Sequence, residues 1–168
     1  MFYFSFFQPP TSLAPSLPTA FTHHVTFLCS SSDVTFVNDV ITQLAQPSFG
    51  FTSQKLEISN DDSSELRCFG REVLPAGVRP LCLIMVMSRC LIANVSRDVN
   101  ATSVDLALSR ATEALQPRSV VILRLDDTCQ LPAPLHGLPV VCVTSPNWWT
   151  SLVSHLCSNG ILRQRTCI

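Results

Sequence analysis

The side chains that could carry out catalysis are few and scattered along the chain. Nucleophilic catalysis needs a Ser or Cys beside a His and an orienting acid, and the four His are His23, His24, His136 and His155. His23 and His24 precede the first expected strand, and His155 falls in the last expected helix. Only His136 lies in an expected loop, where we interpret it as a polar loop residue.

Metal and cofactor motifs are equally sparse. Asp126 and Asp127 are adjacent, but no third carboxylate or His is spaced to complete a metal site, and a solvated turn explains them. The eight Cys form no CxxC pair, which argues against a zinc ribbon. No GxGxxG or GxxxxGK[ST] motif is present, and Ser30–Asp33 follows the first expected strand instead. We therefore expect no metal and no cofactor.

Composition narrows the class of protein. The 168 residues suit one domain; 46% are hydrophobic, 14% are charged and the net charge is -1, which disfavours nucleic acid as a partner. No stretch approaches the roughly 20 apolar residues of a membrane-spanning helix. Most Cys lie in apolar runs such as 81–83 and 141–143, where a reduced thiol packs as a small hydrophobe. We therefore expect a cytoplasmic protein.

Alternating apolar segments predict the elements that would position any site. We expect a disordered Pro/Ser-rich lead over 1–22, one domain over 23–160 and a tail over 161–168. Expected strands cover 25–29, 66–69, 91–95, 119–125 and 138–143; expected helices cover 37–44, 104–115 and 146–156, and 81–87 suits either. Residues 48–64 are expected to form an exposed loop. The pattern predicts an α/β fold: a five-stranded parallel sheet with helices on both faces.

Function in such a sheet gathers in the loops beyond the carboxyl ends of the strands. In the expected element order these loops are 30–33, 70–80, 96–102, 126–137 and 144–147. The loop 70–80 places the apolar residues Val73, Leu74 and Pro75 between Arg71 and Arg79. The loop therefore combines an apolar centre with basic side chains on either side.

The order of these segments resembles the Toll/interleukin receptor (TIR) domain over about residues 23–158. Its first box, a strand entering an acidic loop, is matched by Val25–Asp33. Its second box is approximated by 66–77, with Glu72 where Asp is usual and one extra residue before Gly77. Ser88–Ser96 resembles the lead into the family's third strand and its Leu-Ser ending. The third box is matched by Trp148 and Trp149, which open the last expected helix.

The resemblance implies a flavodoxin-like fold and a role in assembly, as in the cytosolic adaptors of Toll-like and interleukin receptor signalling in innate immunity. Its expected partners are the TIR domains of receptors and adaptors, including further copies of itself, with membranes reached only through receptors. The implied binding residues are Arg71, Glu72, Val73, Leu74, Pro75, Gly77 and Arg79 in one loop, and Ser96, Arg97, Asp98 and Asp105 around the third helix. Asp33, Trp148 and Trp149 are implied to be structural.

Some TIR domains cleave NAD with a Glu on the third helix. Matching Val95-Ser96 to the family's Leu-Ser ending puts Leu108 at that position, and Glu113 lies five residues later, rotated by about 140° on a helix of 3.6 residues per turn. The resemblance therefore implies a domain without this activity. Two alternatives stay open: an NAD hydrolase in a different alignment, and a truncated TIR protein that competes with signalling.

Overall fold

The computed structural model describes residues 12–58, 77–97, 113, 115–116 and 118–161 of the 168-residue chain. The elements in chain order are β1 (His23–Ser30), the 3₁₀ turn η1 (Ser31–Asp33), α1 (Val34–Leu44), β2 (Ser53–Ile58), β3 (Pro80–Met87), α2 (Arg89–Arg97), β4 (Ser119–Arg124), η3 (Ala133–Leu135), β5 (Val140–Cys142) and α4 (Trp148–Ile161).

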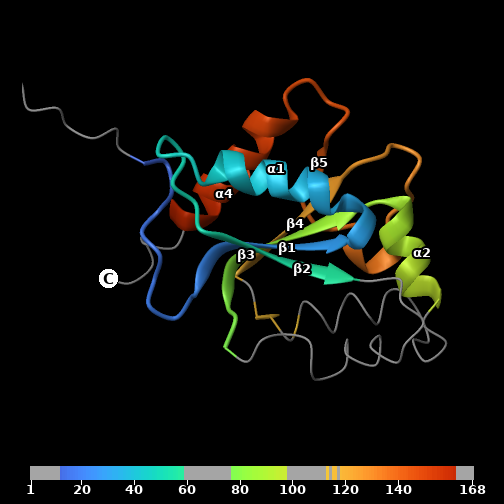
Figure 1. The fold of residues 1–168 in the computed structure, drawn as a ribbon, viewed down its shortest axis with the longest axis horizontal. Coiled ribbons are helices and arrows are strands. Elements are labelled where there is room, and N and C mark those ends of the chain that lie inside the picture. Colours follow the sequence, from blue (N-terminus) through green and yellow to red (C-terminus); the bar gives the residue numbers. More distant parts are fainter. Residues whose placement is uncertain (1–11, 59–76, 98–112, 114, 117, 162–168) are drawn as a thin grey trace, which may run out of the picture.

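The five strands form one parallel sheet in the order β2-β1-β3-β4-β5. The central strand β3 is buried at all eight positions, as a strand covered on both faces should be. Helices α1 and α4 lie together on one side of the sheet, and α2 lies near the ends toward which the strand arrows point (Figure 1). The predicted α/β fold with a five-stranded parallel sheet is confirmed.

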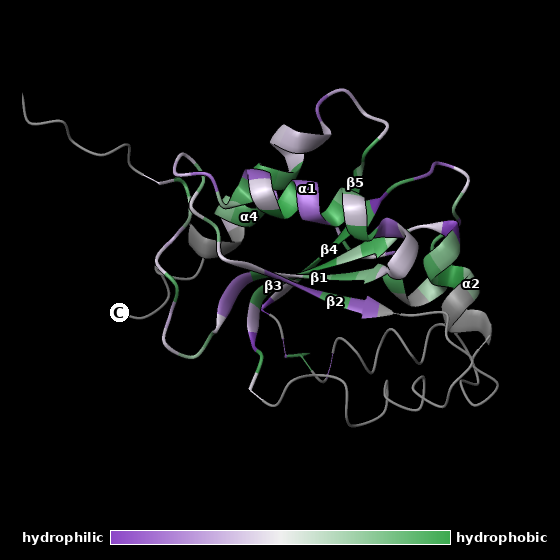
Figure 2. Ribbon diagram, viewed as in Figure 1, coloured by the Kyte–Doolittle hydropathy of each residue, from purple (hydrophilic) through white to green (hydrophobic). Residues whose placement is uncertain are grey.

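Each face of the sheet has its own apolar core. On one face, alternate residues of β1, β3 and β4 pack against Val37, Val40 and Leu44 of α1 and Leu152 and Leu156 of α4. On the other face, the intervening strand residues form a second cluster that includes Leu91 of α2. The hydrophobic colour is strongest along the inner strands, whereas the edge strand β2 carries hydrophilic residues (Figure 2). The alternation of side chains along each strand thus supplies both cores.

Several expected elements are confirmed: the strand at 25–29 as β1, the strand at 119–125 as β4, the strand at 138–143 as the shorter β5, and the helix after the first strand as α1. The segment 81–87, which suited either state, is the strand β3. The last helix was expected over 146–156 and runs from Trp148 to Ile161. The expected strand at 66–69 and most of the expected helix at 104–115 lie outside the described residues.

Two expectations are wrong. The segment 91–95 was expected to be a strand but lies within α2, because the neighbouring apolar run takes the central place in the sheet as β3 and Ser88 begins a helix directly after it. The segment 48–64 was expected to be a loop but contains β2, which pairs in parallel with β1. Its polar composition concealed the strand; Lys55 and Glu57 suit an edge strand, where charged side chains discourage further pairing.

Residues 12–22, expected within a disordered lead, are bonded to the domain. Ala14 N–H donates to the Phe49 carbonyl at 2.8 Å, and Thr22 N–H donates to the Arg79 carbonyl at 2.9 Å. The buried His24 adds a third connection. Thr52 N–H donates to His24 Nδ1 at 3.0 Å, so Nε2 carries the proton and donates to the Pro15 carbonyl at 2.7 Å. The segment is therefore part of the fold.

Candidate functional site

The strand order locates the candidate site at the carboxyl edge of the sheet. In an order of 2-1-3-4-5 the chain leaves β1 and β3 in opposite directions, so their carboxyl ends form the topological switch point at which flavodoxin-like folds bind ligands. The residues that follow these two strands are Ser31–Asp33 and Ser88–Arg89. The side chains of these residues determine which chemistry is available at the carboxyl edge.

Ser88 connects the residues that follow β1 and β3 at this switch point. Its hydroxyl donates to Asp33 Oδ2 at 2.6 Å and accepts the N–H of Leu91 at 3.1 Å. The second bond is an N-cap of α2, with the Ser oxygen bound to an N–H of the first helical turn. Ser88 is 7% exposed. A single buried hydroxyl therefore starts α2 and ties it to the acidic turn after β1.

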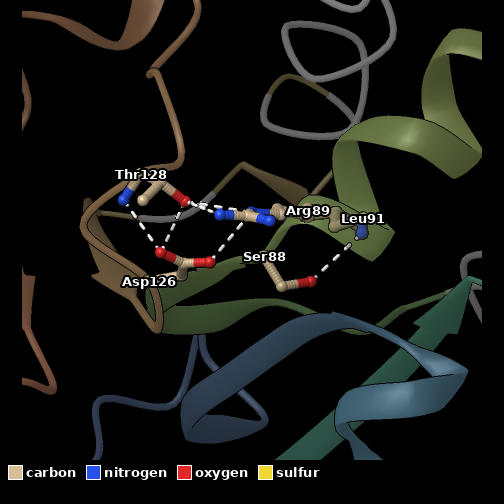
Figure 3. Close-up of polar contacts among 5 residues, drawn as sticks. All are labelled: Ser88, Arg89, Leu91, Asp126 and Thr128. Carbon is tan, nitrogen blue, oxygen red and sulfur yellow. Dashed lines mark hydrogen bonds and ion pairs between the residues drawn. The ribbon is translucent and has the colours of Figure 1, made fainter.

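Arg89 extends the network toward β4. Its Nε lies 3.0 Å from Asp126 Oδ2, and its guanidinium also donates to the Thr128 hydroxyl (Figure 3). Thr128 in turn donates to Asp126 Oδ1 from its hydroxyl at 2.7 Å and from its backbone N–H at 2.8 Å. These two bonds, with the charge of Arg89, lower the pKa of the Asp126 carboxyl below its ordinary value. Both oxygens of the Asp126 carboxylate thus contact basic or hydroxyl donors of the same chain, although the carboxylate itself remains partly exposed.

Asp127 belongs to a second set of contacts. Its Oδ1 accepts from Arg124 Nη2 at 3.0 Å and its Oδ2 accepts from the Thr144 hydroxyl at 2.9 Å. Arg124 also lies 3.2 Å from the sulfur of Cys142 on β5. The adjacent acids Asp126 and Asp127 therefore bind different basic residues. Among the described residues, no three His, Cys, Asp or Glu side chains gather as a metal site would require.

The three residues implied to be structural all lie in the described part of the chain. Asp33 sits at the turn from β1 into α1 and accepts the Ser88 bond. Trp148 and Trp149 open α4 and pack on the core, and Trp148 contacts Phe36 of α1. The first and third boxes of the resemblance thus fall at the junction of β1 with α1 and at the start of the last helix.

Most of the implied binding residues lie outside the described part of the chain: Arg71, Glu72, Val73, Leu74, Pro75, Asp98 and Asp105. Gly77 and Arg79 are described, and both are exposed just before β3. Gly77 has a φ of +95°, a backbone conformation that favours glycine. Arg79 N–H donates to the Thr22 hydroxyl at 3.0 Å, which ties this end of the segment to the sheet.

Ser96 and Arg97 were expected to follow a strand, and they instead end α2. The match of Val95-Ser96 to the end of a third strand therefore fails, since the strand ends at Met87. The placement of Leu108 at the family's Glu position depended on that match and loses its basis. Leu108 itself lies outside the described residues, whereas Glu113 is described and exposed.

Sequence reasoning missed the roles of Ser88 and Thr128. Ser88 follows seven apolar residues and precedes Leu91, Ile92 and Val95, whose spacing suits one face of a helix. A Ser between a strand-like run and a helical pattern is typical of an N-cap, and this signal was available. The partner of Asp126 could not be found in this way, because Arg89 is distant in sequence and only the sheet brings them together.

Comparisons with models of protein families, with curated proteins and with solved structures find no match to this chain. Within the described residues, none of the helices combines the length and the apolar character needed to cross a bilayer.

Proposed function

We propose that this chain is a TIR-type adaptor domain, which binds the TIR domains of receptors and adaptors and associates with further copies of itself. The observation that carries the proposal is the all-parallel sheet in the order β2-β1-β3-β4-β5. It supports the proposal because the resemblance implies a flavodoxin-like fold, and this strand order is the flavodoxin-like one.

The carboxyl edge offers a second line of support. Asp33, Asp126 and Asp127 each accept hydrogen bonds from side chains of the same domain. Carboxylates that are hydrogen-bonded to side chains of their own domain stabilise the connections between its elements. A general acid or base must instead lie within hydrogen-bond distance of a substrate. This pairing favours a structural role for these three acids at the carboxyl edge. We also propose that the domain does not cleave NAD.

The proposed contact surface is the segment from Arg71 to Arg79. Its described end is exposed, and it is joined to the sheet through the backbone of Arg79 and Thr22. Because this end is bonded, a partner that binds there spends less free energy on ordering it. The apolar residues Val73, Leu74 and Pro75 supply contact area, and the flanking Arg residues supply charge for orientation and rate of association.

The test is binding of the full chain to an immobilised receptor TIR domain. We expect Pro75→His and Arg71→Ala each to weaken capture about tenfold or more, which is the loss of roughly 1.4 kcal/mol that a contact residue carries. Arg118→Ala is the matched control, since Arg118 is a surface Arg that lies over the Phe21 ring. Wild-type binding by both segment variants, with unchanged circular dichroism, would rule out this surface.

The competing enzymatic hypothesis has its own readout. Nicotinamide release from NAD by the purified chain should stay at the level of a buffer blank, and Glu113→Gln should change nothing. Release that depends on Glu113 would instead assign the domain to the NAD-cleaving class.

A further inference from the structure

Four aromatic side chains form a continuous row on the side of the domain that α1 and α4 cover. Phe36 of α1 lies 6.0 Å from Trp148, Trp148 lies 5.5 Å from Trp149, and Trp149 lies 5.6 Å from Phe49, each measured between ring centroids. The last two pairs are edge-to-face, with interplanar angles of 81° and 89°. All four rings pack on the core and are only partly buried. The row therefore retains apolar surface in contact with solvent.

The chain enters the described domain beside one end of this row. The Ser12 hydroxyl donates to the carbonyl of Phe49 at 2.9 Å, and Leu13 N–H donates to the carbonyl of Ser48 at 3.3 Å. Ala14 N–H donates to Phe49 as well, so the backbone at Phe49 holds the segment at two points. Leu13 is 52% exposed. Ser12, the described residue to which residues 1–11 are attached, is thus held next to Phe49.

The tethered segment has a composition that matches the row. Residues 2–7 contain Phe2, Tyr3, Phe4, Phe6 and Phe7, and residues 1–11 contain no charged side chain. Aromatic rings gain from offset and edge-to-face contacts with other rings beyond the burial of their area. Eleven extended residues reach roughly 36 Å at about 3.3 Å per residue, which exceeds the three ring-to-ring steps of the row.

We propose that residues 1–11 dock along the aromatic row of their own chain, with the rings of residues 2–7 covering Trp148, Trp149 and Phe36. The occupant is the chain's own segment because it is attached beside Phe49, and a short tether gives it an effective concentration in the millimolar range. This inference goes beyond the proposed function and does not depend on it. It assigns to the Trp pair a binding surface in addition to its packing on the core.

The sequence provides unusually specific probes for this proposal. Trp148 and Trp149 are the only Trp in the chain, and Tyr3 is the only Tyr. Trp emission therefore reports on the row alone, and energy transfer from Tyr to Trp reports on the distance between residue 3 and the row. The full chain should show this transfer and a blue-shifted, weakly quenched Trp emission.

The decisive variant replaces the five rings of residues 2–7 by Ser. We expect its acrylamide quenching constant for Trp to rise about twofold, because the rings that cover the indoles are gone. Tyr3→Phe should abolish the energy transfer and leave quenching unchanged, since the ring remains. Phe21→Ser is the matched control, because Phe21 lies against Arg118 and has no contact with the row among those described. Circular dichroism and thermal unfolding establish that each variant is folded.

Two further arms separate other occupants. Energy transfer that grows with protein concentration would mean that a second copy supplies the segment, and transfer that appears only with phosphatidylcholine vesicles would assign the segment to a membrane surface. Either result overturns the proposal. Unquenched Tyr3 emission, together with identical Trp quenching in the wild type and the five-ring variant, would overturn it as well.

Discussion

Removing the hydroxyl of Ser88 should measurably destabilise the domain. Ser88→Ala leaves the N–H of Leu91 without its cap and leaves Asp33 without the donor at 2.6 Å. Loss of an N-cap costs about 1 kcal/mol. The bond to a carboxylate would be worth about 1.5–3 kcal/mol if fully buried, and Asp33 is half-buried, so we count about 1 kcal/mol for it. The expected total is about 2 kcal/mol.

The assay is urea unfolding of the full chain followed by circular dichroism. A loss of about 2 kcal/mol lowers the ratio of folded to unfolded protein roughly thirtyfold. Asp33→Asn keeps an acceptor oxygen without the charge and should cost less than about 1 kcal/mol. Ser145→Ala, an exposed Ser before α4, is the matched control and should change stability by less than about 0.5 kcal/mol.

A double-mutant cycle tests whether Ser88 stabilises the domain through its hydrogen bond to Asp33. If Ser88 and Asp33 stabilise the edge through their bond, the effects of Ser88→Ala and Asp33→Ala should overlap by about 1 kcal/mol in the double variant. Strictly additive effects, or a loss below about 0.5 kcal/mol for Ser88→Ala, would show that this hydroxyl does not tie β1 to α2.

Three other predictions follow from burial and charge. Arg89→Ala should cost less than about 1 kcal/mol in the same unfolding assay, because its bridge to Asp126 lies in solvent; a larger loss would mean that the pair is structurally essential. Leu152→Ala should cost about 2–5 kcal/mol, since this side chain is fully buried against the α1 face, and a loss below 1 kcal/mol would contradict that packing. Burial raises the pKa of the Cys82 thiol to about 11, and burial with nearby carboxylates raises that of Cys29 to about 11. The folded state then holds these protons more tightly than the unfolded state, so the thiols make their full contribution to the free energy of unfolding below about pH 9 and lose it between pH 9 and 11. In unfolding curves measured across this range, Cys82→Ala should make the free energy of unfolding fall less steeply with pH. An unchanged pH slope would contradict this prediction.

The sequence was most informative where local pattern and tertiary structure agree. The apolar run at 119–125 and the helical spacing behind Asp33 both predicted their elements, because a strand buried on two faces and an amphipathic helix have distinctive compositions. The assignment failed at 91–95, where β-branched and apolar residues suit a strand or a buried helix equally. Whether such a segment is a strand or a helix depends on which apolar segment occupies the centre of the sheet, and here that segment is β3.

Part of the candidate site could also be predicted from the sequence. The loops at the carboxyl edge could be placed once the strands were known, and Asp33 and Asp126 were recognised as residues of that edge. Their partners Ser88 and Arg89 were missed, because the strand expected at 91–95 hid both the end of β3 at Met87 and the N-cap signal at Ser88. The wrong assignment of this one element therefore also invalidated the inferences that depended on it. One of these was the comparison of Leu108 with the catalytic Glu of NAD-cleaving TIR domains.

Self-association of the full chain tests the central claim most directly. Light scattering over a range of concentrations should show a mass that rises with concentration for the wild type. In Pro75→His the same rise should require about tenfold more protein, with Arg118→Ala unchanged. A wild-type chain that stays monomeric throughout, alone and when mixed with a receptor TIR domain, would contradict the assignment of this fold to TIR-type assembly.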